Sequence, residues 1–364
     1  MLISTGSLFL VAAQENYTKN DHPDFFDHLS ITATAHKGFV LPEYEYFLFV
    51  VQDYVQSVSL NFSKRTTGKN DWEQLYRFPE YGISLFYSTL GNDQVYGREI
   101  ALFPFFKYHL YSRKGFSFDH QVGLGIGYVT KKFDMEENYR NIAVGSHMNI
   151  HFNFGLDLKY LLAKKYQLCT GISFDHFSNG NLKEPNLGIN SLTAYLGLGY
   201  IVGNSYQPVE HALEPHRKNH HIELIYSIGG KYTRLYESIY YFTCSGTVEY
   251  KYEPFQIFHV GIGADIFYDS STERVMNALQ LGDYKKKYDF RTGIHVSQEI
   301  VYNKVSLIIQ EGVYLLLVDN VEHNIMYNRG IVRFRLTDHI LVNISMKSHL
   351  QVLDYPELGL GYRF

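Results

Sequence analysis

The segment 174–190, FDHFSNGNLKEPNLGIN, carries the residues of this chain that are best suited to hydrolytic chemistry. His176 and Ser178 are two positions apart, so both side chains project from the same face of an extended strand. A serine hydroxyl beside an imidazole is a nucleophile beside its general base, the pair that attacks esters. Two mildly polar groups can also simply end a strand near a membrane interface. The surrounding residues must therefore decide between the two interpretations.

Asn190, on the strand that follows, shares its face with Leu192, Ala194 and Leu196, so its side chain is expected on the lipid side as well. Its amide oxygen can hold one imidazole nitrogen, but it brings no charge to stabilise the imidazolium ion. Replacing the carboxylate of a catalytic triad by its amide can cost about 10⁴ in turnover. Glu184, in the intervening loop, is a substitute acid, whereas Asp175 is expected to point to the opposite face of its strand.

Asn179 and the backbone around Gly180 are the candidate donors of an oxyanion hole, because they lie next to the serine. The same two residues also suit a hairpin turn, in which asparagine and glycine adopt left-handed backbone conformations. The sequence leaves both roles open.

The elements that must position these residues follow a period of two. In 121–128, 220–228 and 340–350, apolar residues on one face alternate with small or polar residues on the other. Many such runs span about 10 to 14 residues, which is longer than most soluble strands and suits a tilted membrane strand. His176 and Ser178 share their face with Tyr166, Leu168, Ile172 and Phe174, so this face is expected to contact lipid.

Composition indicates a membrane barrel. Hydrophobic residues make up 45% of the 364 residues, with 32 Tyr, 26 Phe and 29 Gly, yet no run approaches the roughly 20 apolar residues of a spanning helix. The net charge of −4 is small and the basic residues are scattered, which argues against a nucleic-acid partner. We expect no cofactor and no metal site, because the histidines near 211–221 lack supporting ligands of defined spacing. The chain is predicted to be an all-β, antiparallel outer-membrane β-barrel of a Gram-negative cell.

About sixteen strands are expected, and fourteen would also fit the length. The expected strands are 29–38, 55–65, 80–90, 97–112, 116–131, 144–161, 165–178, 189–202, 220–233, 238–252, 255–269, 287–301, 303–318, 325–336, 339–350 and 355–364. We predict one barrel with both termini on the periplasmic side, although the pattern alone permits two smaller barrels.

The segment 203–219, with two prolines and several charges, is expected to link two halves, 29–202 and 220–364. Each half ends on LGLGY, at 196–200 and at 358–362, which favours duplication of an eight-stranded unit whose copies are related by rotation about the barrel axis. His349 takes the place in the second half that His176 holds in the first. No serine follows His349 and it is expected on the interior face, so we predict that it is not catalytic.

The two ends of the chain suggest export and insertion. Residues 1–13 resemble a signal peptide cleaved before Gln14, or else an ordinary first strand, and residues 14–28 would form a periplasmic segment. The terminal Phe364, in step with Leu358, Leu360 and Tyr362, resembles the signal by which the outer-membrane insertion machinery recognises barrels. A disulfide between Cys169 and Cys244 is not favoured, because their strands are distant in sequence.

The 174–190 segment resembles the PagL-type lipid A 3-O-deacylases, and in particular their larger relatives in Bacteroidota, the acyloxyacyl hydrolases. That family carries a His-aromatic-Ser-Asn motif, a Lys-x-Pro-Asn turn and a catalytic acid on the next strand. The residues that match are His176, Phe177, Ser178, Asn179, Pro185, Asn186 and Gly188, whereas Asn190 stands where the family has its glutamate.

The resemblance implies an outer-membrane esterase that removes an ester-linked acyl chain from lipid A, part of the lipopolysaccharide of the outer leaflet. Ser178 would be the nucleophile and His176 the base, and restoring an acid with Asn190→Glu is expected to maintain or raise activity. The alternative is a non-enzymatic barrel, a pore or a subunit of an outer-membrane complex, in which this site has degenerated.

Overall fold

The computed structural model describes residues 28–42, 45–180, 182–203, 208–213, 215–233, 239–316, 324–349 and 352–364. The expected signal peptide lies outside these residues, as does nearly all of the expected periplasmic segment. Along each strand, buried polar residues alternate with exposed apolar ones, the inverse of a soluble sheet.

The first half forms a closed antiparallel barrel, in which β8 pairs back onto β1. Its strands are β1 (Leu29–Leu41), β2 (Val55–Arg65), β3 (Glu80–Thr89), β4 (Arg98–Arg113), β5 (Phe116–Val129), β6 (Met148–Leu162), β7 (Tyr166–Ser178) and β8 (Ile189–Val202). Two short helices lie in its connections, α1 (Glu45–Val50) at one end and α2 (Asp71–Leu75) at the other.

The second half forms another closed barrel, in which β16 pairs back onto β9. Its strands are β9 (Asn219–Tyr232), β10 (Tyr240–Phe255), β11 (Phe258–Asp269), β12 (Phe290–Tyr302), β13 (Val305–Leu316), β14 (Met326–Arg335), β15 (Ile340–His349) and β16 (Val352–Arg363). The helix α3 (Thr272–Leu279) and the 3₁₀ helix η1 (Lys286–Asp289) lie between β11 and β12. None of the helices in the described ranges is long and apolar enough to cross a membrane.

The sixteen expected strands are therefore confirmed, and the alternative of fourteen is wrong. The prediction that they close as one barrel is also wrong, as is the relation of the halves by rotation about a shared axis, because each half closes on itself. An eight-stranded barrel has an interior just wide enough for side chains, so inward-pointing charges meet across it. Lys159 Nζ lies 2.7 Å from Glu80 Oε2 in the first barrel, and Arg333 Nη1 lies 2.6 Å from Glu223 Oε2 in the second.

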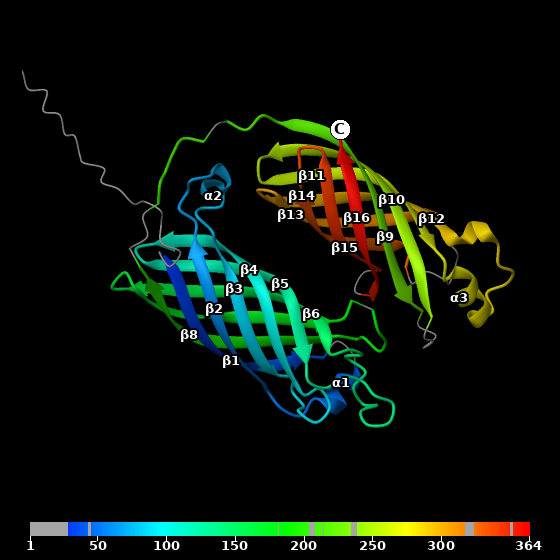
Figure 1. Cartoon of the computed structure of the whole chain (residues 1–364), viewed down its shortest axis with the longest axis horizontal. Coiled ribbons are helices and arrows are strands. Elements are labelled where there is room, and N and C mark those ends of the chain that lie inside the picture. Colours follow the sequence, from blue (N-terminus) through cyan, green and yellow to red (C-terminus); the bar gives the residue numbers. More distant parts are fainter. Residues whose placement is uncertain are drawn as a thin grey trace, which may run out of the picture.

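The two barrels lie side by side with their strand ends facing the same two directions (Figure 1). At the end that carries α2, the Tyr76 hydroxyl donates to the Val301 carbonyl at 2.9 Å, and its ring lies 4.7 Å from that of Tyr302. Tyr302 also packs on Phe106, with 4.4 Å between ring centres. These contacts join the barrels at the end opposite the candidate site.

An apolar cluster caps the first barrel at the end where β7 finishes. It is built from α1, the long loop between β5 and β6, and the inward residues of the barrel rim. Phe47 and Val50 of α1 are almost fully buried in it, as are Phe177 and Ile189, which pair across β7 and β8. Because Phe177 is anchored in this cluster, its neighbours on β7 must point outward.

The C-terminal residue closes the second barrel. The Phe364 amide donates to the Ile222 carbonyl at 3.0 Å, and its exposed ring lies 4.8 Å from that of Tyr362. Recognition of this end by the insertion machinery stays a prediction.

Candidate active site

The register of β7 and β8 brings the three expected catalytic residues together. His176 pairs directly with Asn190, and Ser178 is the last residue of β7. All three side chains lie on the outer face of the barrel wall. Residues directly opposite each other on one face of an antiparallel pair have Cβ atoms about 5 Å apart, within reach of a hydrogen bond between side chains.

The hydrogen bonds run in the order that nucleophilic catalysis requires. His176 Nδ1 lies 2.6 Å from Asn190 Oδ1, and His176 Nε2 lies 3.0 Å from Ser178 Oγ. A carbonyl oxygen only accepts, so Nδ1 carries the imidazole proton and donates it to Asn190. Nε2 is then the basic nitrogen and accepts the serine proton. This arrangement is a Ser-His-Asn relay, with an amide in the place of the usual carboxylate.

The serine is shielded from bulk water. Ser178 is 8% exposed and His176 is half-buried, although both lie on the outer wall. Low water access strengthens the hydrogen bonds of a site and limits side reactions of an acyl intermediate.

Asn179 fixes the turn after the serine. Its backbone N–H donates to Asn186 Oδ1 at 2.8 Å and its side-chain NH₂ donates to the Lys183 carbonyl at 2.7 Å. These two hydrogen bonds hold Asn179 within the loop, and its role as an oxyanion donor stays a prediction. Gly180, with φ of +67°, follows in the left-handed conformation that glycine tolerates. The Gly180 N–H also stays a predicted oxyanion donor.

Glu184, the expected substitute acid, lies half-buried in the 182–188 part of the same loop. Asn190 Oδ1 lies 2.6 Å from the imidazole nitrogen that a substitute acid would hold, and the role of Glu184 stays a prediction. His349 lies inside the second barrel, 3.2 Å from Asp354 Oδ2, as expected for a residue without a catalytic role. Cys169 and Cys244 are both free.

Gly188, one of the residues that match the motif, lies against the imidazole, a position that the motif alone did not reveal. A Cβ on this glycine would lie 2.9 Å from His176 Cε1 and 3.3 Å from Ser178 Cβ, and its φ is +73°. Its N–H donates to the Ala143 carbonyl at 2.9 Å, which ties it to the capping loop. A bare backbone therefore packs on the imidazole and fixes its position.

The variant Gly188→Ala is expected to lower ester hydrolysis by about 10²-fold, because a displacement near 1 Å in a catalytic group has an effect of this size. The control is Gly282→Ala, at a glycine with φ of +96° and no atom within 4 Å of the added Cβ. Both variants strain the backbone, but only the first contacts the imidazole. Equal rates for the two, measured with a chromogenic ester on folded protein, would exclude this role for Gly188.

Comparison with protein families places both barrels in one group of outer-membrane proteins. Residues 56–199 match the model of lipid A 3-O-deacylase (PagL), and residues 220–364 match the model of the acyloxyacyl hydrolase C-terminal domain. Together the two matches span more than three quarters of the chain. The protein is thus an outer-membrane β-barrel of hydrolase type. It belongs to the PagL-type lipid A deacylase and acyloxyacyl hydrolase family.

Solved structures give weaker similarities. The outer-membrane enzyme PagL aligns at 17% identity and a TM-score of 0.31, over 46% of this chain and 97% of that chain. Omp33 of Acinetobacter baumannii aligns at 7% identity and a TM-score of 0.17, over 93% and 97% of the two chains. A mutant porin of Rh. blastica aligns at 10% identity and a TM-score of 0.18, over 92% and 99%. A comparison with curated proteins finds no match.

Proposed function

We propose that this protein hydrolyses an ester-linked acyl chain of lipid A in the outer leaflet, through Ser178 and His176 on the outer wall of the first barrel. The observation that carries the proposal is the unbroken relay from Ser178 Oγ through the imidazole to Asn190 Oδ1. A membrane lipid reaches this wall without leaving the bilayer.

The reaction proceeds through an acyl-enzyme. Ser178 Oγ attacks the ester carbonyl carbon while its proton passes to His176 Nε2, and the Gly180 N–H donates to the developing oxyanion. The carbon–oxygen bond to the sugar then breaks, and the departing alkoxide takes the proton from His176. Water, deprotonated by the same nitrogen, attacks the acyl-enzyme and releases the fatty acid and free Ser178.

Asn190 holds the imidazole in the productive tautomer and orientation, but it adds no charge. Hydrolysis should therefore be slow compared with that of a relative bearing a carboxylate at this position. The wall of the barrel supplies the remaining requirement, a dry surface along which the acyl chain can lie.

The pore alternative receives no support from the interiors. Buried ion pairs cross both barrels, including those of Lys107 with Asp157 and of Lys251 Nζ with Glu299 Oε2 at 3.1 Å. A barrel of eight strands packed in this way leaves no wide aqueous path.

Two measurements on protein reconstituted in vesicles test the proposed function. Lipid A should lose the mass of one acyl chain in its mass spectrum, and a fluorophosphonate probe should form an adduct on the peptide that contains Ser178. A protein that leaves lipid A intact and does not react with the probe would be a non-enzymatic barrel.

A further inference from the structure

The second barrel contacts the catalytic hairpin of the first. The methyl carbon Cε of Met346, on the outer face of β15, lies 3.0 Å from the position that a Cβ would take on Gly180. On its other side, Gly180 has Ile150 Cδ1 of β6 at 3.7 Å from the same position. Gly180 is two residues from the nucleophile and is the proposed oxyanion donor. A residue of the second barrel is thus part of the surroundings of the reacting atoms.

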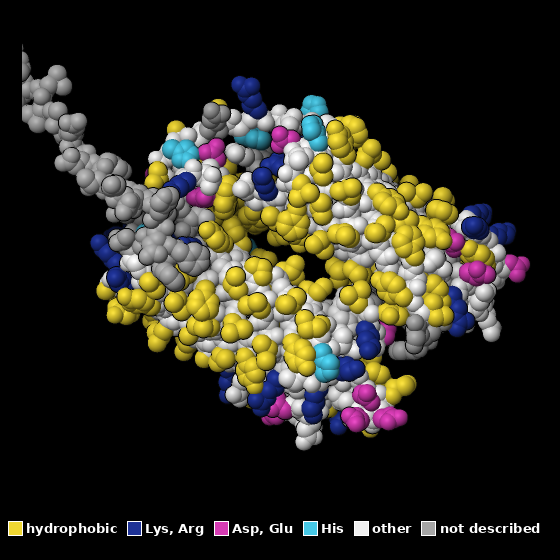
Figure 2. Space-filling model, in the orientation of Figure 1, with side chains coloured by type: hydrophobic (Ala, Val, Ile, Leu, Met, Phe, Trp, Pro, Cys, Tyr) yellow, Lys and Arg dark blue, Asp and Glu magenta, His cyan; other side chains and the backbone are white. Residues whose placement is uncertain are grey.

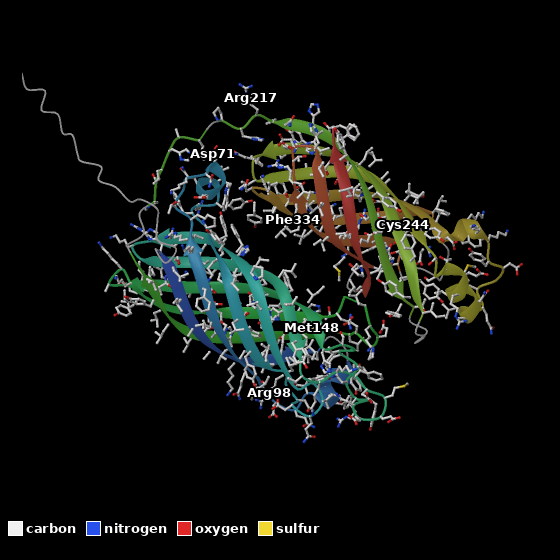
Figure 3. The ribbon with its side chains drawn as sticks, in the orientation of Figure 1. Asp71, Arg98, Met148, Arg217, Cys244 and Phe334 are labelled. Atoms are coloured by element: carbon white, nitrogen blue, oxygen red, sulfur yellow. The ribbon has the colours of Figure 1, made fainter. Side chains whose placement is uncertain are left out.

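The outer face of the second barrel lacks a side chain next to Met346. Met346 pairs across the strands with Gly330 of β14, which is exposed, and a Cβ on Gly330 would meet no atom within 4 Å. Val332 and Phe334 continue the same outward face of β14, and Phe334 lies on the side of the second barrel that faces the first (Figure 3). Gly330 therefore leaves open space on this outward face beside Met346, Val332 and Phe334, and we call this space the groove.

The groove opens onto a gap between the barrels that is lined by hydrophobic side chains (Figure 2). The gap is closed at the far end by the contact of Tyr76 with Tyr302, and it is bounded at the catalytic end by the contact of Met346 with Gly180. Both walls carry the outward-facing residues of membrane strands, so the space lies at the depth of lipid tails. A saturated hydrocarbon chain is the occupant that matches its chemistry and its depth.

We propose that this gap is the acyl-chain site of the enzyme, and that the second barrel forms its far wall. The chain to be cleaved runs from Ser178 between Ile150 and Met346 and then along the groove at Gly330, so the second barrel selects which acyl chain is cleaved. This inference rests on the proposed function, and it assigns a role to a barrel that contributes no residue to the relay.

The variant Gly330→Phe tests the inference, because its Cβ would enter open space and its ring would occupy the groove. It should lower release of a long acyl chain from lipid A by about tenfold or more, since even one methylene in an apolar pocket changes rates by such factors. Hydrolysis of p-nitrophenyl acetate, whose acyl group is too short to enter the groove, should keep the rate of the unmodified protein.

The matched control is Gly246→Phe. Gly246 is also an outward glycine, on β10, which is four strands from β14 in the closed order of eight and therefore opposite. Its added Cβ meets only the flexible Ile266 side chain, at 3.2 Å. Cys244 of the same strand lies away from the first barrel (Figure 3). This control should leave both substrates unaffected, and a Gly330→Phe protein that matches it on lipid A would overturn the proposal.

A second measurement does not depend on turnover. A benzophenone amino acid is placed at position 330 or at position 246 of full-length Ser178→Ala protein, in vesicles of equal parts phosphatidylethanolamine and lipid A. On illumination, the probe at position 330 should cross-link more lipid A than phosphatidylethanolamine. The probe at position 246 should cross-link the two lipids in proportion to their abundance in the vesicles. Equal capture at the two positions would overturn the groove. If the unmodified protein releases no acyl chain while the Ser178→Ala protein still captures lipid A in excess at position 330, the proposed function is refuted and the groove stands.

Discussion

Replacing Ser178 by alanine is expected to abolish acyl release, with a loss of up to about 10⁶ in turnover, the size reported for a serine hydrolase without its nucleophile. The Ser178 Oγ atom has a single catalytic contact, to His176 Nε2 at 3.0 Å, and its removal leaves the imidazole with no proton to accept. The measurement is the lipid A mass spectrum after incubation with equal amounts of folded protein.

Thr170→Val is the control for this variant. Thr170 lies on the same outer face of β7, further from the site, and its hydroxyl donates to the Tyr195 carbonyl at 2.9 Å. Removing a hydroxyl from this wall should change stability by roughly 1 kcal/mol and leave turnover unchanged. Residual acyl release by Ser178→Ala at the level of Thr170→Val would mean that another group is the nucleophile.

Asn190→Asp is expected to raise turnover, by as much as about 10⁴ if the whole loss known for an amide in a catalytic triad is recovered. A carboxylate oxygen would occupy the place of Asn190 Oδ1, 2.6 Å from His176 Nδ1, and would stabilise the imidazolium that forms during attack. A charge near the rim of a barrel costs only about 0–1 kcal/mol, so the variant should fold. The measurement is kcat on lipid A.

Aspartate is preferred to glutamate because it has the length of asparagine, and Asn190 Oδ1 already lies 2.6 Å from His176 Nδ1 across the two strands. Asn190→Asp in the Ser178→Ala background must stay inactive, which shows that any gain passes through the serine. An unchanged rate for Asn190→Asp alone would mean that the amide oxygen positions the imidazole and that charge adds nothing to catalysis here.

The sequence predicted the strands and the faces of their residues because a two-residue period reports which side of a sheet a residue occupies. His176, Ser178 and Asn190 could be placed on one wall for this reason, whereas the loop 179–188 is too long to fix by itself the register that pairs His176 with Asn190. The same period does not indicate which strand pairs with the first strand to close the barrel. The pairing of β1 with β8 therefore could not be read from it, although the complementary charges of the interior, such as Lys159 and Glu80, were a signal of a narrow barrel.

Contacts between segments that are distant in the chain also could not be predicted from the sequence. Gly188 touches the imidazole because a loop returns over the strand end, and Met346 approaches Gly180 because two separate barrels meet. Gly188 belongs to the same motif as His176, but neither the motif nor a periodic pattern indicated either contact. The motif predicted that Asn179 and Gly180 lie beside the serine, but it did not indicate that Asn179 is hydrogen-bonded to Asn186 and Lys183 within the loop.

The closure of each half on itself has a consequence for how the chain assembles. The first barrel is closed by the pairing of β8 with β1. The stretch of chain between the two closing strands therefore runs only from β1 to β8, whereas a single sixteen-stranded barrel would have to close β16 onto β1. Doubling the length of chain that a closure must span costs only about 0.6 kcal/mol in chain entropy. Closing after eight strands instead of sixteen therefore adds little to the equilibrium stability of the barrel. The larger effect is on folding kinetics. Unpaired strand edges can pair with other chains for as long as they are exposed, and early closure shortens that time. A barrel that seals after its own eighth strand protects its edges before the second half has been threaded into place.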